Sequence, residues 1–94
     1  FSQVIQEHFP LLEQYTPVLV RVHGESHPEL AKVLEVFLRM DAKVKAGTVS
    51  EIDLSQEFKD LREATGSYAI PSDACETYIA TYEMLEEADK AYHL

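Results

Sequence analysis

The chain has 94 residues and is poor in cysteine, in glycine and in basic side chains. Its single cysteine excludes an internal disulfide framework and any zinc site built from several cysteines. Its three glycines are scattered singly, which excludes a glycine-rich phosphate-binding loop. No apolar run approaches the ~20 residues that a membrane-spanning helix needs. These absences leave a small globular protein as the expectation.

The scarcity of basic residues bears on the partners of the protein. Lysine and arginine number 8 against 17 aspartates and glutamates, for a net charge of -9. Nucleic acids and anionic membranes are bound through basic patches, so we expect neither as a partner. Most of the acid falls in residues 48–94, where solvated helix faces explain it, with a basic partner or a cation site as the alternative. The chain does not begin with a basic stretch followed by an apolar one, so we expect a cytoplasmic protein.

Apolar residues make up 46% of the chain, which is typical of a folded domain, and we expect one domain over residues 1–94. The first helix is predicted over residues 3–22, with Ile5, Leu12 and Leu19 widening its apolar stripe. Pro10 and Pro17 predict a kink or a late start of this helix. The main stripe recurs at helical spacing and consists of Val4, His8, Leu11, Tyr15, Val18 and Val22.

The second helix is predicted from Ser26 to Gly47. Gly24 before it is a candidate left-handed cap, and Ser26 with Glu29 fits a capping box. Its apolar stripe predicts one buried face, with ion pairs four residues apart on the exposed side. The stripe consists of Leu30, Val33, Leu34, Phe37, Leu38, Met40 and Val44.

Two further helices follow a polar connection in which Thr48, Ser50 and Asp53 are candidate caps. A short one contains Leu54, Phe58 and Leu61 and stops at Gly66, and the last one is predicted to open at Pro71-Ser72-Asp73. No segment alternates apolar and polar residues as a strand does. The sequence therefore predicts an all-α, up-and-down four-helix bundle with a short third helix.

Four histidines are the candidates for site chemistry: His8, His23, His27 and His93. His8 falls on the first apolar stripe and is predicted to be a core or boundary residue. His23 and His27 have a metal-ligand spacing on a helix, although Gly24 and Pro28 argue against a continuous helix between them. His93 lies next to Leu94, the last residue of the sequence. No Glu-x-x-His pair, which di-iron bundles use, is present.

No nucleophile and base are arranged for catalysis, so we expect no enzyme and no catalytic residue. Cys75 falls in the first turn of the last predicted helix, where we expect it to serve packing. The tyrosines gather toward that helix, and a core or dimer surface explains them better than a cofactor site.

Residues 20–30 read VRVHGESHPEL, and residues 71–78 read PSDACETY after a lead-in with Leu61 and Arg62. The first segment is similar to the Val-His-Gly and His-Pro-Glu-Leu motifs of the repair of iron centres family, and the second resembles its Pro-x-x-Ala-Cys-x-Thr segment. Members of that family are hemerythrin-like di-iron proteins that help iron–sulfur clusters recover from nitrosative or oxidative stress. Most of the chain except its middle follows the family, which implies a hemerythrin-like bundle.

The same resemblance implies that His23 occupies the position of an iron ligand, whereas the other family ligands are missing. The family's opening histidine would fall near Phe1, its middle His-x-x-x-Glu is absent, and the histidine of its third helix would fall near Glu51. Its closing His-x-x-x-Glu would begin beyond Leu94. The chain is thus a shortened, ligand-poor relative in this interpretation.

Two functions follow. The first is a small cytoplasmic, non-catalytic helical module without a cofactor, which self-associates as a homodimer because a truncated bundle leaves apolar stripes to cover. The alternative is a stress-response protein that binds non-haem iron through His23, with His27, His93, Glu51, flanking residues or a second chain completing the site.

Overall fold

The computed structural model describes residues 1–47 and 51–94. These residues form four α-helices and contain no strand, which confirms the all-α four-helix bundle with a short third helix. The helices are α1 (Ser2–His23), α2 (Glu29–Ala46), α3 (Ser55–Thr65) and α4 (Glu76–Tyr92). None of them is long and apolar enough to cross a membrane.

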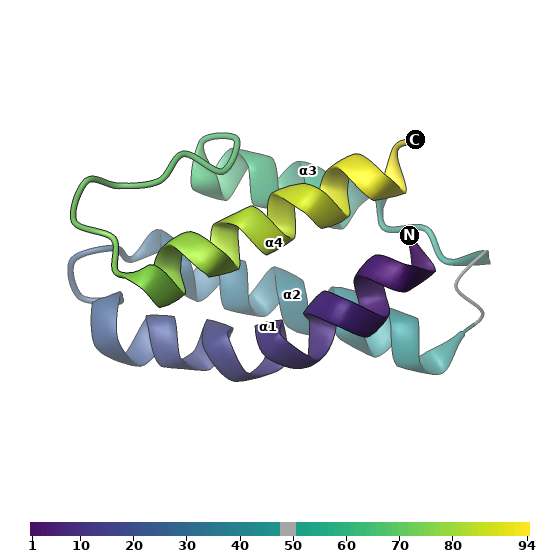
Figure 1. The fold of residues 1–94 in the computed structure, drawn as a ribbon, viewed down its shortest axis with the longest axis horizontal. Coiled ribbons are helices and arrows are strands. Elements are labelled where there is room, and N and C mark those ends of the chain that lie inside the picture. Colours follow the sequence, from purple (N-terminus) through teal and green to yellow (C-terminus); the bar gives the residue numbers. More distant parts are fainter. Residues whose placement is uncertain (48–50) are drawn as a thin grey trace.

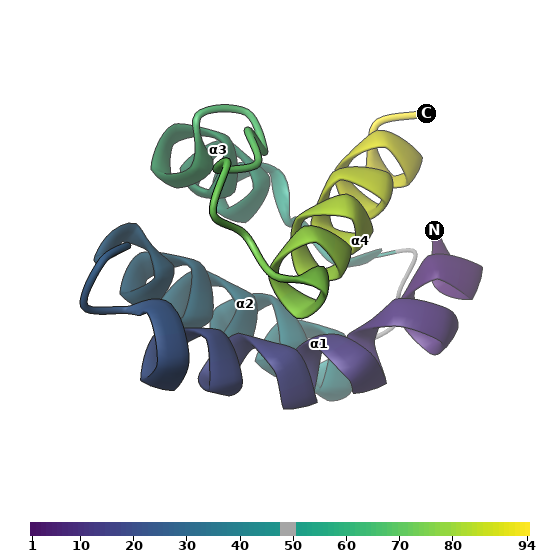
Figure 2. The ribbon, with the colours of Figure 1, turned by 60° about the vertical axis from the view of Figure 1, so that its left-hand side comes forward.

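The helices form two layers. α1 packs against α2 and α4, and α2 packs against α3. Figures 1 and 2 show α1 and α2 side by side, with α3 above α2 and α4 above α1. Both ends of the described chain lie at the same end of the bundle, as expected of an up-and-down arrangement (Figure 1).

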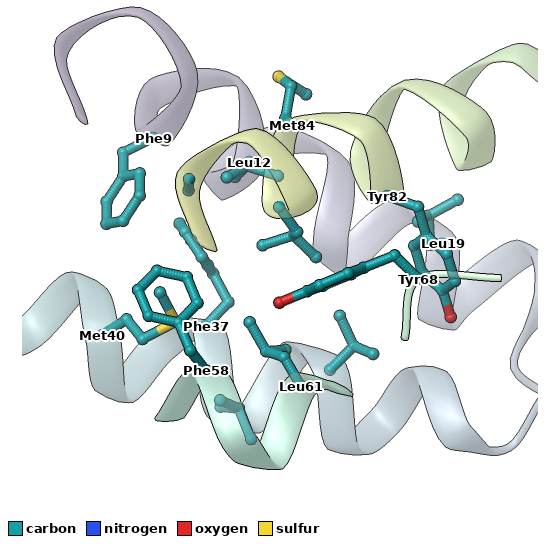
Figure 3. Close-up of a cluster of buried hydrophobic side chains, with 14 of the residues drawn as sticks. Phe9, Leu12, Leu19, Phe37, Met40, Phe58, Leu61, Tyr68, Tyr82 and Met84 are labelled. Carbon is teal, nitrogen blue, oxygen red and sulfur yellow. The ribbon is translucent and has the colours of Figure 1, made fainter. Parts of the chain in front are cut away.

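The core draws side chains from all four helices and from the connection before α4. Its aromatic rings meet edge to face, and Phe9 of α1 lies 5.2 Å from Phe37 of α2 between ring centroids. Burial of this apolar surface is the main stabilising contribution to the fold. Figure 3 shows a representative set of these residues: Phe9, Leu12, Leu19, Phe37, Met40, Phe58, Leu61, Tyr68, Tyr82 and Met84.

The side of α1 that faces the core differs from the predicted main stripe. The buried residues of α1 are Phe9, Leu12, Thr16 and Leu19. Leu12 and Leu19 were expected at the edge of the stripe and instead lie at its centre. The physical reason is that α1 carries two adjacent apolar stripes, and periodicity alone does not select the one that faces α2 and α4. Thr16 fits the buried stripe because its hydroxyl donates to the Leu12 carbonyl oxygen at 2.8 Å.

The two prolines lie inside α1, which begins at Ser2, so the predicted late start is wrong. Pro10 and Pro17 are both exposed, and their spacing of seven residues places them on the same side of the helix. Helices bend with their convex side toward solvent, and a proline there removes a hydrogen bond on the outer side. Figure 2 shows α1 changing direction along its length, in agreement with the predicted kink.

The turn between α1 and α2 corrects two predicted caps. Gly24 has the right-handed values φ -60° and ψ -27°, and is not left-handed. A Cβ there would clash with the Val20 carbonyl oxygen, so close backbone approach explains the glycine. The cap of α2 is Pro28, without a side-chain hydrogen bond, so Ser26 and Glu29 form no capping box. The Ser26 and His27 amides instead donate to the His23 carbonyl oxygen.

The Gly66 end of α3 follows the prediction, whereas its first cap is Leu54, one residue after the candidate Asp53, and has no side-chain cap hydrogen bond. Asp53 accepts a hydrogen bond from the Ser55 amide at 2.9 Å, and Gly66 closes the helix in the left-handed region at φ 63°. Thr48 and Ser50, the other two candidate caps, lie outside the described residues. Ser67 and Tyr68 continue in the left-handed region at φ 58° and φ 65°. Such backbone is strained for residues other than glycine by about 1 kcal/mol each.

The start of α4 differs from the predicted one. The segment from Pro71 to Asp73 forms a turn, and the helix begins at Glu76 with Cys75 as its cap. The Ala74 amide donates to the Pro71 carbonyl oxygen within that turn. The turn places Asp73 ahead of the helix, where its carboxylate meets the α1–α2 turn.

Candidate functional site

The end of α1 meets the beginning of α4 at one end of the bundle. His23 is the last residue of α1, and its Nε2 atom lies 3.3 Å from the Sγ atom of Cys75, the cap of α4. The His23 ring packs on Tyr78 with 5.5 Å between ring centroids. The histidine is half-buried and Cys75 is exposed. The expected packing role of Cys75 is therefore wrong, because α4 begins later than predicted and leaves the thiol at the surface.

His27 lies on the same end and makes its contacts with carboxylates. Its Nε2 atom is 3.0 Å from Oδ2 of Asp73, and its Nδ1 atom is 3.7 Å from Oε2 of Glu29. The Asp73 hydrogen bond raises the pKa of His27 above its ordinary value, and the same contact lowers the pKa of Asp73. The pair thus links the α1–α2 turn to the connection before α4 by an electrostatic contact.

Tyr78 lies beneath both histidines. Its side chain is fully buried, and its ring is 5.4 Å from the His27 ring in an edge-on arrangement. Its hydroxyl makes no hydrogen bond with any residue that the structure describes. Burial raises the pKa of the phenol. Together, His23, His27, Asp73, Cys75 and Tyr78 form what we call the histidine end of the bundle.

His93 is at the other end of α4, about 25 Å of helix away from the histidine end. Its Nδ1 atom is 2.9 Å from Oδ1 of Asp89. Asp89 is buried and also accepts hydrogen bonds from Arg62 at 2.8 Å and from the Tyr68 hydroxyl at 2.6 Å. Burial and this carboxylate raise the pKa of Tyr68.

A pocket of about 340 Å³ opens beside Asp89. Its wall carries two cationic side chains, Arg62 and Lys90, and two carboxylates, Glu86 and Asp89. The lysine, arginine and carboxylate side chains of the wall therefore carry no excess of one sign of charge. The complete lining is Arg62, Ser67, Tyr68, Glu86, Asp89, Lys90 and His93.

The predicted metal ligands can now be compared with the requirements of a di-iron centre, which needs several carboxylates and histidines that converge. The structure brings His23 and His27 to one end, each with its own partner, and leaves His93 at the other. Glu51 is exposed on the connection that leads to α3. Within residues 1–47 and 51–94, no three histidine, cysteine or acidic side chains gather around a common point. The described residues do not fit a di-iron centre.

Two further histidine and tyrosine predictions agree with the structure. His8 is half-buried at the boundary of the core, and its Nε2 atom pairs with the Glu87 carboxylate of α4. Tyr78 and Tyr82 are core residues that pack on each other with 5.0 Å between ring centroids.

The Asp89 contacts were not predicted. Asp89 and His93 have the i,i+4 spacing that places two side chains together on a helix, and that signal was available in the sequence. Arg62 and Tyr68 are 27 and 21 residues from Asp89, so no local pattern pairs them with it. The Cys75 and Asp73 contacts of the histidine end are equally distant along the chain.

Comparison with known proteins gives one distant relative. The chain is 22% identical over 124 aligned positions to the iron-sulfur cluster repair protein ScdA of Staphylococcus haemolyticus (strain JCSC1435). The alignment covers 99% of this chain and 56% of the relative, so the chain spans little more than half the length of that protein. No family profile and no solved structure matches the chain. The chain is therefore a helical protein with a distant similarity to an iron–sulfur cluster repair protein.

Proposed function

We propose that the chain is a cytoplasmic helical module of iron–sulfur cluster repair, that it self-associates, and that it acts through protein contacts and not as an enzyme. The similarity to an iron–sulfur cluster repair protein over 99% of the chain carries this proposal. In this proposal the bundle is of the hemerythrin-like type and has kept the scaffold while its di-iron ligands are lost.

The contacts of the histidine end support a scaffold role. His23 contacts the thiol of Cys75, and His27 contacts the Asp73 carboxylate. Each histidine therefore joins the α1–α2 side of the bundle to the segment that leads into α4. Such contacts fix the position of α4 and need no metal ion.

Repair activity in cells tests the function. In a strain that lacks the gene, recovery of an iron–sulfur enzyme such as a dehydratase is measured after a pulse of nitric oxide or peroxide. The wild-type gene is expected to restore recovery, and so is His23→Asn, which removes the imidazole ligand but keeps a polar side chain beside Cys75. No restoration by the wild-type gene contradicts the proposal. If His23→Asn abolishes restoration while its helix content by circular dichroism is unchanged, metal chemistry is favoured instead.

A second function, metal binding under stress, is favoured by one observation. Two donor pairs, His23 with Cys75 and His27 with Asp73, lie on the same end against Tyr78. Residues of a second chain or flanking residues would have to complete an iron site there. Elemental analysis of untagged protein after aerobic iron loading decides between the two functions. Less than about 0.1 equivalent of iron, manganese or zinc per chain contradicts metal binding, because a real site fills stoichiometrically.

A further inference from the structure

α1 has a second apolar stripe that the bundle covers only in part. Leu11 is 40% exposed and Val22 is 61% exposed, and Tyr15 and Val18 between them are half-buried. These four residues, which we call the outer stripe, follow one another at spacings of four, three and four. That is the heptad spacing at which two helices pack side by side. The buried stripe of the same helix faces the core, and Tyr15 packs against the edge of that core, whereas Leu11 and Val22 remain exposed.

We propose that the outer stripe is the contact surface with a second copy of this chain, and that the two α1 helices run antiparallel across a twofold axis. This inference rests on the proposed function and specifies the surface of its self-association. A twofold axis requires a surface that is complementary to itself. The charges beside the outer stripe meet this requirement.

The register follows from the apolar residues. The outer stripe alternates between two heptad positions, one held by Leu11 and Val18 and the other by Tyr15 and Val22. In an antiparallel pair, a residue at the first position faces a residue at the second position of the other helix. Placing Leu11 opposite Tyr15 of the second copy also places Val18 opposite His8 and Val22 opposite Val4. Every layer of the contact then contains an apolar residue from at least one chain.

The same register pairs opposite charges. Glu7, Gln14 and Arg21 flank the outer stripe on its solvent side at intervals of seven residues, and all three are exposed. In the antiparallel register Glu7 faces Arg21 of the second copy, Arg21 faces Glu7, and Gln14 meets its own counterpart. Opposite charges at these flanking positions select partner and orientation in paired helices.

A parallel pair offers no such match. In a parallel pair, the residues that flank the stripe on its solvent side in one helix face the residues that flank it on its core side in the second helix. On α1 the core-side flank of the stripe carries Ile5, Leu12 and Leu19, which belong to the core or pack against it. Glu7 and Arg21 would then have no charged partner, so the charge pattern favours the antiparallel orientation.

Charge reversal tests the register directly by sedimentation equilibrium of the full chain. Wild-type protein is expected to form a dimer. Glu7→Arg or Arg21→Glu alone creates two like-charge contacts and is expected to weaken the dimer about tenfold. The double variant is expected to restore the wild-type affinity, and so is an equal mixture of the two single variants. Failure of both the double variant and the mixture to recover overturns the antiparallel register.

Apolar substitutions test the surface itself. Leu11→Glu combined with Val18→Glu is expected to give a monomer whose helix content by circular dichroism is unchanged. Leu38→Glu is the matched control, because Leu38 is 52% exposed on α2 and lies outside the outer stripe. A wild-type chain that sediments as a monomer, or a dimer that survives the double substitution, overturns the proposal.

The cellular repair assay separates this inference from the proposed function. A dimer that the outer-stripe variants dissociate establishes the interface whether or not the chain restores recovery of an iron–sulfur enzyme. Restored recovery by a chain that is monomeric in sedimentation supports the repair function and overturns the interface. Capture of a basic helical partner on a monomeric chain would assign the outer stripe to a different protein and equally overturns it.

Discussion

Arg62 of α3 donates from a single guanidinium nitrogen to both carboxylate oxygens of Asp89 in α4, at 2.8 Å each. Asp89 is buried, and the Tyr68 hydroxyl donates to the same carboxylate at 2.6 Å. The backbones of α3 and α4 lie farther apart than those of the main packing pairs of the bundle, so side-chain contacts join them: this polar contact, and the Phe58 and Tyr92 rings at 5.2 Å between centroids. It also fixes Tyr68, whose left-handed backbone needs surrounding contacts to persist.

Asp89→Asn is expected to lower the free energy of unfolding by about 2 kcal/mol, because Arg62 and Tyr68 lose a charged acceptor. This loss of stability is smaller than for a fully buried ion pair, because Arg62 is partly exposed. Urea denaturation followed by circular dichroism measures it. Glu86→Gln on the same pocket wall is the control, with an expected change below about 0.5 kcal/mol because its pair with Lys90 is long and exposed. Equal effects of the two variants would contradict a stabilising role of Asp89.

The contact between His27 and Asp73 predicts a pH-dependent stability. His27 has a pKa above its ordinary 6.5, so its contribution is complete below pH 6.5 and is lost as the pH rises through the raised value. Asp73 has a pKa below its ordinary 3.8, so its contribution is complete above pH 3.8 and is lost as the pH falls through the lowered value. The pair therefore contributes most between these two ordinary values. The charged groups that face His27 are Asp73 and Glu29.

Nuclear magnetic resonance titration of the histidine ring protons checks this prediction. Asp73→Asn is expected to move the pKa of His27 back toward 6.5, since its largest cause is the Asp73 hydrogen bond. Glu29→Gln is the matched control, because Glu29 lies farther away at 3.7 Å and contributes less. If Glu29→Gln moves the His27 pKa more than Asp73→Asn does, the assigned cause is wrong.

Two neighbouring leucines test which side of α1 faces the core. Leu12 is fully buried and Leu11 is 40% exposed. Leu12→Ala is expected to lower the free energy of unfolding by about 2 to 5 kcal/mol through lost burial and a cavity. Leu11→Ala is expected to cost less than about 1 kcal/mol when measured at a protein concentration at which the chain is monomeric. The same urea titration measures both, and the reverse order would place the main predicted stripe in the core.

Most of the fold was predictable because its signals are local. Gly66 and the apolar residues Leu54, Phe58 and Leu61 correctly predicted α3, and the four helices were all identified. The predicted buried side of α1 was displaced, since Leu12 and Leu19 lie at its centre while Tyr15 only packs against its edge. Two adjacent apolar stripes have the same period, and only contacts with α2 and α4 choose between them. The start of α4 was placed too early because Pro71 is a good first-turn residue in a helix and an equally good turn residue.

The candidate site was predictable only in part, since its contacts are between distant segments. The Val-His-Gly motif singled out His23, and the spacing of four residues added His27; the structure places both at one end of the bundle. Their partners Cys75 and Asp73 are 52 and 46 residues away, so spacing carried no information about them. His93 was grouped with the other histidines by residue type, whereas the length of α4 separates it from them.

Gly24→Ala tests the close backbone approach at the turn between α1 and α2. Gly24 has an ordinary right-handed backbone, so conformational preference alone predicts that alanine is tolerated. The Cβ of an alanine at position 24 would, however, clash with the Val20 carbonyl oxygen, which is backbone and cannot rotate away. We expect Gly24→Ala to lower the free energy of unfolding by about 1 to 2 kcal/mol, because the turn has to shift.

Gly47→Ala is the matched control. A Cβ at position 47 would meet its nearest atom, in Ile52, at an ordinary 3.6 Å, so the free energy of unfolding is expected to change by less than about 0.5 kcal/mol. Thermal and urea unfolding of the two variants measure the difference, and tolerance of alanine at both positions would show that the α1–α2 turn relaxes without cost.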